Sequence, residues 1–162
     1  MGKKLFQEFI EEVRGPLHIY TDGACSGNPG NGGFGIYMHD EHDHDFSFSG
    51  YEENTTNNRM EMLAAITALE FFVAPHPAHV TVYTDSKYLQ NGIQSWIHNW
   101  KKNNWKTAGR DPVKNQDLWM RLDAVNIKLK PLWEWVPGHS HVFGNERADA
   151  LARNAIIAMR MR

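Results

Sequence analysis

Two aspartates end the same short pattern in separate parts of the chain, and their placement could create a carboxylate site. Asp22 and Asp85 each complete a Tyr-Thr-Asp sequence that follows residues rich in Ile, Val and Thr, which are typical of β-strands. If these strands are neighbours in one sheet, both carboxylates meet at the edge where ligands usually bind. Taken alone, either aspartate would more often form a turn or cap a helix.

Two further acids, Glu61 and Asp149, lie in the first turns of predicted helices. An acid in this position ordinarily complements the helix dipole. As a set, however, the four acids offer only hard oxygen ligands, which suit Mg²⁺ or Mn²⁺ rather than zinc. Converging carboxylates would repel one another without a cation, so the set indicates one or two divalent ions. His139, in a loop before the last helix, could transfer protons near neutral pH, although a surface histidine is the alternative.

Residues 96–114, here called the basic segment, concentrate positive charge on a chain whose net charge is −2. The segment itself carries +4, so the remainder carries −6. It also holds three of the six tryptophans, Trp96, Trp100 and Trp105. Lysines interleaved with aromatic residues favour a projecting element that binds the phosphates of a nucleic acid. Trp96 and Trp100 are also one helical turn apart, so helix packing is the alternative.

The elements that must position these residues follow from hydrophobic periodicity and from Gly and Pro breaks. They are a helix at 3–13, a strand at 17–22, a Gly-rich loop at 23–33, strands at 34–39 and 46–51 around a polar turn at 40–45, a helix at 57–73, a strand at 79–84, a helix from about 86, a helix around 118–125, a strand at 131–136 and a helix at 144–158. This order predicts an α/β domain with a mixed sheet flanked by helices.

Composition limits the class of protein. A chain of 162 residues fits one domain, and its single cysteine, Cys25, excludes an intramolecular disulfide. Its apolar runs are too short for a membrane span, and its first residues do not resemble a signal peptide. We therefore expect a soluble, cytoplasmic protein that does not bind membranes.

Two other patterns are weaker indications of function. Residues 30–35 satisfy the Gly-x-Gly-x-x-Gly pattern, but strand-like rather than helical residues follow, which excludes a dinucleotide site. Residues 39–45 are rich in His and Asp and could bind a metal, but at a hairpin tip a solvated turn is the better interpretation.

Five ordered motifs resemble the type I ribonuclease H family, over residues 17–158. They are the segments at 20–30, 55–61, 84–86, 96–106 and 138–149. The resemblance implies a ribonuclease H-like fold with a five-stranded mixed sheet. It also implies Mg²⁺-dependent hydrolysis of the RNA strand of RNA–DNA hybrids by two-metal-ion catalysis, with 5′-phosphate and 3′-hydroxyl ends; Mn²⁺ could substitute.

The resemblance assigns roles to particular residues. Asp22, Glu61, Asp85 and Asp149 would be catalytic metal ligands, and His139 would assist proton transfer or product departure. The expected substrate-binding residues are Cys25, Asn28, Thr56, Asn57, Asn58, Lys87, Trp96, Trp100, Lys101, Lys102, Trp105 and Lys106.

This sequence departs from the family pattern in two places. Lys87 stands where a well-studied bacterial member has Gln, so substrate contacts there can differ. An extension at 1–16, expected to pack on the body, precedes the single domain at 17–162.

Two other functions remain open at this stage. A DNA strand-transferring or junction-cutting nuclease of the same fold would share the acids, but the basic segment and the motif at 55–61 argue against it. A catalytically inactive module that binds hybrids would not need all four acids. We expect a monomer whose partner is an RNA–DNA hybrid duplex.

Overall fold

A computed structural model describes residues 5–138 and 142–161, and its centre is one five-stranded sheet in the order β3-β2-β1-β4-β5. The strands are β1 (Leu17–Gly27), β2 (Gly30–His39), β3 (Asp45–Thr55), β4 (Val80–Thr84) and β5 (Leu132–Trp135). β1, β2 and β3 form an antiparallel meander, whereas β4 runs parallel to both β1 and β5. The mixed sheet predicted from the sequence is therefore confirmed.

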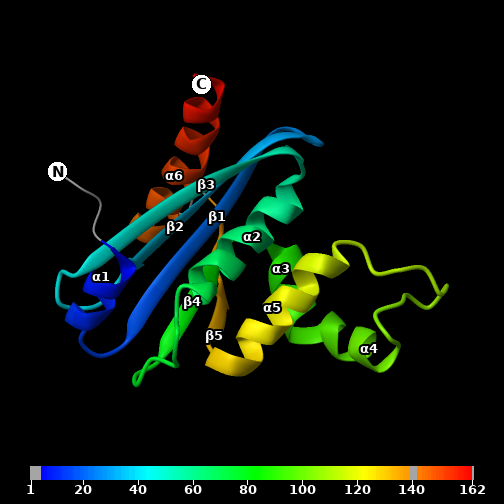
Figure 1. Ribbon diagram of the computed structural model, residues 1–162, viewed down its shortest axis with the longest axis horizontal. Coiled ribbons are helices and arrows are strands. Elements are labelled where there is room, and N and C mark those ends of the chain that lie inside the picture. Colours follow the sequence, from blue (N-terminus) through cyan, green and yellow to red (C-terminus); the bar gives the residue numbers. More distant parts are fainter. Residues whose placement is uncertain (1–4, 139–141, 162) are drawn as a thin grey trace.

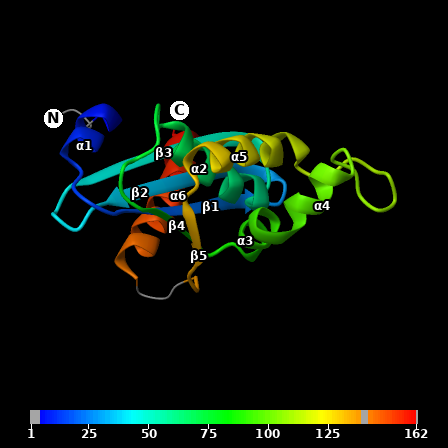
Figure 2. The same cartoon turned by 90° about the horizontal axis from the view of Figure 1, so that it is seen from below.

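Helices cover both faces of this sheet (Figures 1 and 2). On one face lie α2 (Asn57–Glu70) and α5 (Gln116–Leu129), and α6 (Phe143–Arg160) crosses the other face. α2 is apolar nearly all round because it lies between the sheet and α5, and nine of its fourteen residues are buried. No helix in the described part of the chain is long and apolar enough to span a membrane.

The prediction of a Gly-rich loop at 23–33 is wrong, because this stretch continues β1 to Gly27 and begins β2 at Gly30. The antiparallel ladder runs through it from Gly23↔Phe34 to Gly27↔Gly30. Gly23 and Gly33 serve helix packing, whereas Gly27, with a positive φ of 94°, lies where β1 turns into β2. A Cβ on Gly33 would lie 2.3 Å from the carbonyl oxygen of Ala152, and a Cβ on Gly23 would lie 2.5 Å from the backbone nitrogen of Glu61. Glycine at these positions lets α6 and α2 approach the sheet on opposite faces.

The helix expected from residue 86 is interrupted. It consists of α3 (Lys87–Asn91), one wide π-helical turn at Gly92–Trp96, and α4 (Ile97–Lys102). The wide turn lies where the fully buried ring of Trp119 packs on Gly92, at which a Cβ would be only 1.9 Å from the ring. Tertiary packing of this kind leaves no periodic signal in the sequence.

The N-terminal extension packs on the body through α1 (Phe6–Glu12), as expected. Phe6 and Phe9 are buried and belong to the main hydrophobic core. The Phe6 ring lies 5.0 Å from that of Phe72 and 5.5 Å from that of Phe46, measured between centroids. These contacts join α1 to the residues that follow α2 and to β3, which lies at one edge of the sheet.

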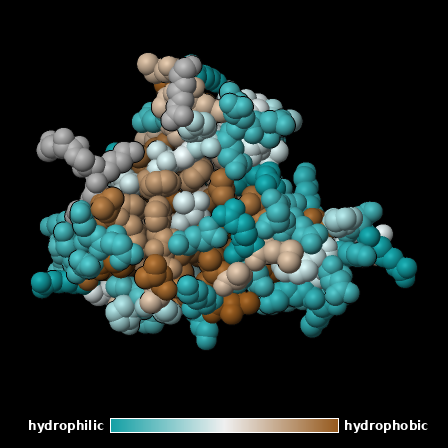
Figure 3. Space-filling model, viewed as in Figure 1, coloured by the Kyte–Doolittle hydropathy of each residue, from teal (hydrophilic) through white to brown (hydrophobic). Residues whose placement is uncertain are grey.

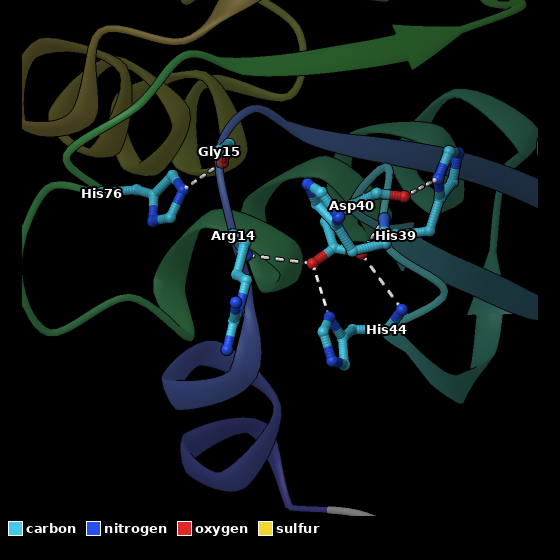
Figure 4. A network of polar contacts seen from close by, with 7 residues as sticks. Arg14, Gly15, His39, Asp40, His44 and His76 are labelled. Atoms are coloured by element: carbon cyan, nitrogen blue, oxygen red, sulfur yellow. Dashed lines mark hydrogen bonds and ion pairs between the residues drawn. The ribbon is translucent and has the colours of Figure 1, made fainter.

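Most of the His- and Asp-rich turn at 39–45 is exposed, as expected of a solvated turn, but Asp40 at its start is buried, with 3% of its surface exposed. Its Oδ1 accepts hydrogen bonds from the backbone N–H groups of His42 (2.9 Å) and His44 (3.0 Å). Its Oδ2 lies 2.9 Å from the backbone nitrogen of Arg14, which donates to it, and 2.7 Å from Nδ1 of His44 (Figure 4). Burial alone would raise the pKa of Asp40, but these hydrogen bonds hold that pKa well below its usual range.

Replacing Asp40 by Ala is expected to lower the free energy of unfolding by about 2–4 kcal/mol, because several buried donors lose their acceptor. Since the pKa of Asp40 is lowered on folding, its stabilising contribution is complete near neutral pH and is lost as the pH falls below about 4. Urea denaturation at pH 7 and pH 3 measures both effects. Glu41→Ala, at an exposed position in the same turn, should change stability by less than about 0.5 kcal/mol. Equal effects of the two substitutions would show that Asp40 does not hold the turn.

Candidate active site

The fold brings together carboxylates from three different elements. Asp22 lies on β1, Glu61 on the first turns of α2, and Asp85 directly after β4. One carboxylate oxygen of each lies within 4.8 Å of the others. Within residues 5–138 and 142–161 this is the only group of three or more His, Cys, Asp or Glu side chains that close together. The His- and Asp-rich turn therefore forms no comparable cluster among the described residues.

Local packing explains this convergence. β1 and β4 are parallel neighbours, paired as far as Tyr20↔Tyr83, so the residues two positions later meet at the same edge of the sheet. We had predicted that Asp22 ends its strand, and this is wrong. The strand β1 continues past Asp22 to Gly27 in its pairing with β2. Thr56 caps α2, and its hydroxyl accepts a hydrogen bond from the backbone N–H of Arg59. That cap and the close approach at Gly23 place Glu61 beside Asp22.

The three clustered carboxylates line a cavity with a volume of about 180 Å³, and Asp149 lines the same cavity. Asn145 and Glu146, from the first turns of α6, line it as well. Asp149 is not part of the tight group of three, and its Oδ2 accepts a hydrogen bond of 3.0 Å from Nε of Arg153. Sequence reasoning did not identify Asn145, which is buried. Its position one helical turn before Asp149, on the same helix face, was the available signal.

Burial and mutual repulsion make the cluster resist ionisation. Burial raises the pKa of Asp22 to about 7; the charges of Asp85 and Asp149 add to this, whereas hydrogen bonds with Glu61 and the Gly23 N–H oppose it. Burial and the charge of Asp22 raise the pKa of Glu61 as well. Without a cation, the buried Asp22–Glu61 pair therefore tends to retain a proton at neutral pH.

One oxygen of the cluster has an unmet requirement that a cation could satisfy. Oε2 of Glu61 is buried and has no hydrogen-bond partner among the residues that the structure describes. Such an acceptor costs free energy unless it finds a partner. The surrounding ligands are carboxylate oxygens, which suit Mg²⁺ or Mn²⁺. The residues present therefore fit a divalent ion.

The predicted proton-transfer residue His139 lies outside the described residues. The chain leading to it does reach the cluster, because a Cβ on Gly138 would lie 3.2 Å from Oδ2 of Asp85. Gly138 follows β5, the strand that pairs in parallel with β4.

Several of the polar residues expected to bind substrate lie close to one another. Oδ1 of Asn28, between β1 and β2, accepts a hydrogen bond of 3.2 Å from the backbone N–H of Asn57. Sγ of Cys25 donates to the carbonyl oxygen of Thr55 at 3.3 Å. The β1–β2 turn and the start of α2, which carries Thr56 and Asn58, thus form one polar surface. Whether these residues contact substrate stays a prediction.

The basic segment projects from the body at the end of α4, and its visible surface is mostly hydrophilic (Figures 1 and 3). Lys102 and Lys106 are exposed, whereas Nζ of Lys101 forms an ion pair with Asp123 on α5 at 3.2 Å. The Trp96 and Trp100 rings lie 5.9 Å apart between centroids.

The tryptophans of the basic segment also pack on the body. The Trp100 ring lies 5.4 Å from that of the buried Trp119, and the Trp105 ring packs against the core. Part of the Trp100 ring therefore packs against the body, which is the alternative that its helical spacing from Trp96 had suggested.

An ion pair that the sequence did not reveal connects the polar surface at the start of α2 with the base of the basic segment. Both terminal nitrogens of Arg59, next to the polar residues at the start of α2, donate to Asp117 at 3.0 and 2.7 Å. Arg59 also donates to Asn115, the residue directly after the basic segment, at 3.3 Å. Asn115 in turn donates to the Tyr88 hydroxyl on α3 at 3.0 Å. This network fixes the start of α2 relative to the base of the basic segment.

Solved structures first define the class to which this fold and carboxylate cluster belong. The chain superposes with a TM-score of 0.78 and 27% identity on the crystal structure of LC9-RNase H1, described as a type 1 RNase H with the type 2 active-site motif; the match covers 91% of this chain and 75% of that one. LC11-RNase H1 in complex with RNA/DNA hybrid gives a TM-score of 0.67 and 25% identity, covering 89% and 99%. The fold is that of a ribonuclease H.

Sequence relatives then define the family. The family model described as RNase H matches residues 14–157. Ribonuclease H of Rhodopseudomonas palustris (strain HaA2) is 54% identical over 147 residues, which cover 91% of this chain and 89% of that protein. Ribonuclease H of Paracoccus denitrificans (strain Pd 1222) is 54% identical over 141 residues, covering 85% and 90%. The chain belongs to the ribonuclease H family of nucleases, and the resemblance drawn from its motifs is confirmed.

Proposed function

We propose that the protein hydrolyses the RNA strand of RNA–DNA hybrids in a reaction that needs a divalent cation, and that it leaves 5′-phosphate and 3′-hydroxyl ends. The observation that carries this proposal is the group of three carboxylates with its orphaned buried oxygen, in a chain about half identical to proteins named Ribonuclease H. LC11-RNase H1, which shares the fold, is described in complex with an RNA/DNA hybrid.

The carboxylates of Asp22, Glu61 and Asp85, with Asp149 at the edge of the cavity, would hold one or two ions, Mg²⁺ in the first instance and Mn²⁺ as a substitute. Such ions activate water and stabilise the charge on the leaving oxygen. The protein's own contribution is to fix these carboxylates on rigid elements before substrate arrives. His139, by resemblance, would assist proton transfer near the leaving group.

Selection of RNA would rest on the polar surface at the start of α2. A-form duplexes present ribose 2′-hydroxyls in a wide, shallow minor groove. Short amides such as those of Asn57 and Asn58 can hydrogen-bond to these hydroxyls, while Thr56 and Asn28 would contact the DNA strand. The basic segment would hold the duplex through its phosphates without reading sequence.

Comparing three labelled substrates tests the proposal directly. With Mg²⁺ or Mn²⁺ we expect cleavage of the RNA strand in a hybrid, no cleavage in EDTA, and little cleavage of duplex DNA or a four-way junction. Preferential cutting of the junction or the DNA would favour the DNA nuclease instead. Binding of the hybrid without turnover would identify an inactive binding module. Light scattering of the purified protein would check the expected monomer.

Replacing Lys102 and Lys106 together by Ala is expected to weaken hybrid binding and flatten its dependence on salt. Each phosphate contact contributes about 0.7–0.9 to the slope of log K against log salt, so the slope should fall by between about one and two. Lys101→Ala should change the slope less, because Asp123 already engages its ammonium. Fluorescence anisotropy between 50 and 200 mM KCl measures these slopes.

Lys128→Ala, an exposed lysine near the end of α5, is the matched control for this measurement. Turnover at saturating substrate should fall less than affinity in the double variant, because the basic segment is separate from the carboxylates. If the slope of the double variant equalled that of the control, the basic segment would lie outside the interface.

A further inference from the structure

Trp135 lies where three features of the candidate active site meet. It is the last residue of β5, and it pairs with Thr84, the last residue of β4. Its indole Nε1–H donates a hydrogen bond of 3.1 Å to the backbone carbonyl oxygen of Asp85. Nζ of Lys87 lies 3.7 Å from the centroid of its ring. The half-buried Trp135 side chain therefore contacts both the backbone of Asp85, a residue of the carboxylate cluster, and the ammonium of Lys87, two residues further along the chain.

We propose that Lys87 contacts a backbone phosphate of the bound nucleic acid beside the carboxylate cluster, and that Trp135 is the positioning residue that holds both Lys87 and Asp85. This inference rests on the proposed function, because it concerns the nucleic acid that the site binds.

The chemistry of the cation identifies its ligand as a phosphate. Phosphates are the only fully charged groups on a nucleic-acid duplex, so a lysine ammonium contributes there mainly as a point charge. The face of an aromatic ring attracts an ammonium without providing a strong acceptor for its N–H groups. Held over Trp135, the exposed Lys87 can thus still donate hydrogen bonds to phosphate oxygens.

Electrostatics give this cation a specific task. Asp22, Glu61 and Asp85 present negative charge to a substrate whose backbone is also negative. A positive charge placed at the first residue of α3, next to the cluster, lowers that repulsion where the phosphates must approach. A free lysine would spread its charge over many rotamers, whereas the Trp135 ring restricts it.

The hydrogen bond to Asp85 gives Trp135 a second effect that is independent of Lys87. Asp85 follows β4 directly, and the backbone N–H of Val136 donates to the carbonyl oxygen of Thr84 at 2.9 Å. Together these bonds tie the residues after β4 to the end of β5. Loss of the indole N–H should therefore disturb the carboxylate that it positions even when an aromatic ring remains.

Binding of a hybrid duplex to proteins that carry Asp22→Asn tests the phosphate contact without cleavage. Lys87→Gln should reduce the salt slope by about 0.7–0.9, and Lys87→Arg should leave it unchanged. Lys128→Gln, an exposed lysine near the end of α5, should also leave it unchanged. An equal slope in Lys87→Gln and in the parent would overturn the proposal.

A double-mutant cycle tests the positioning role. Trp135→Leu should weaken binding about two- to fivefold when residue 87 is Lys, which is the range of a cation–π contact, and should have no further effect on the Lys87→Gln protein. Trp135→Phe, which keeps an aromatic face, should bind nearly as well as the parent. Equal weakening by Trp135→Leu in both backgrounds would mean that Trp135 does not act through Lys87.

Kinetics with Asp22 intact separate the two effects of Trp135. Lys87→Gln should mainly raise KM, Trp135→Phe should mainly lower kcat, and Trp135→Leu should change both. A merely structural role would lower the melting temperature without this division. If the parent neither cut nor bound hybrid, the proposed function itself would fail. If it did both while the Lys87 and Trp135 variants behaved like the parent, only the present inference would fail.

Discussion

Replacing Asp22 by Asn should reduce hybrid cleavage by more than about 10³-fold while hybrid affinity changes by only a few-fold. Asp22 is 5% exposed, and its carboxylate lies with those of Glu61 and Asp85. Asn keeps the shape but offers a neutral ligand, and a divalent ion in such a site contributes several kcal/mol of transition-state stabilisation. Affinity comes mostly from phosphate contacts elsewhere. Single-turnover cleavage in Mg²⁺ and anisotropy with the same hybrid measure the two quantities.

Asp43→Asn provides the matched control, because it makes the same chemical change at an exposed turn whose positive φ of 65° Asn tolerates. It should retain cleavage close to that of the parent. Near-parental cleavage by Asp22→Asn would remove Asp22 from the catalytic set. A large loss of hybrid affinity in the same protein would indicate that Asp22 shapes the binding surface instead.

The sequence predicts the location of the carboxylate cluster because the signals for it are local. The repeated Tyr-Thr-Asp pattern marks Asp22 and Asp85, which meet if their two strands are neighbours, and the parallel pairing of β1 with β4 meets that condition. Thr56 is a recognisable helix cap, and it predicts the start of the helix that carries Glu61. The structure does bring these carboxylates together, although β1 continues past Asp22 to Gly27 and the predicted strand end was therefore wrong.

The sequence does not predict features that depend on contacts between distant segments. Gly33 looks like a loop residue but is a strand residue placed against the backbone of Ala152. Asp40 looks like a solvated turn residue but is buried, and it accepts a hydrogen bond from the backbone N–H of Arg14, which is 26 residues away in the chain.

Two further residues of the site have partners that are more distant still. Arg59 and Asp117 are 58 residues apart, and Trp135 and Asp85 are 50 residues apart. No periodicity or spacing links residues so far apart, so only the packed structure reveals these pairs.

In EDTA the same Asp22→Asn substitution should stabilise the protein at pH 8 but not at pH 4–5. The pKa of Asp22 is raised from 3.8 to about 7 by burial first and by the neighbouring charges of Asp85 and Asp149. Between these pH values the folded protein binds more protons than the unfolded chain, so the parent loses stability as the pH rises. Above pH 7 the penalty reaches roughly 4 kcal/mol by linkage, and Asn, which cannot ionise, avoids it.

Denaturation midpoints of the two proteins from pH 4 to pH 8 in EDTA measure this difference, and excess Mg²⁺ should reverse it. An ion that binds only the folded parent stabilises it in proportion to the logarithm of its concentration, and the variant lacks one carboxylate to hold it. The Asp43→Asn control should follow the parent at every pH, because its carboxylate is exposed. A variant less stable than the parent at pH 8 in EDTA would mean that favourable interactions of the negative charge on Asp22, such as the strengthening of the hydrogen bond from the Gly23 N–H, outweigh the repulsion within the cluster.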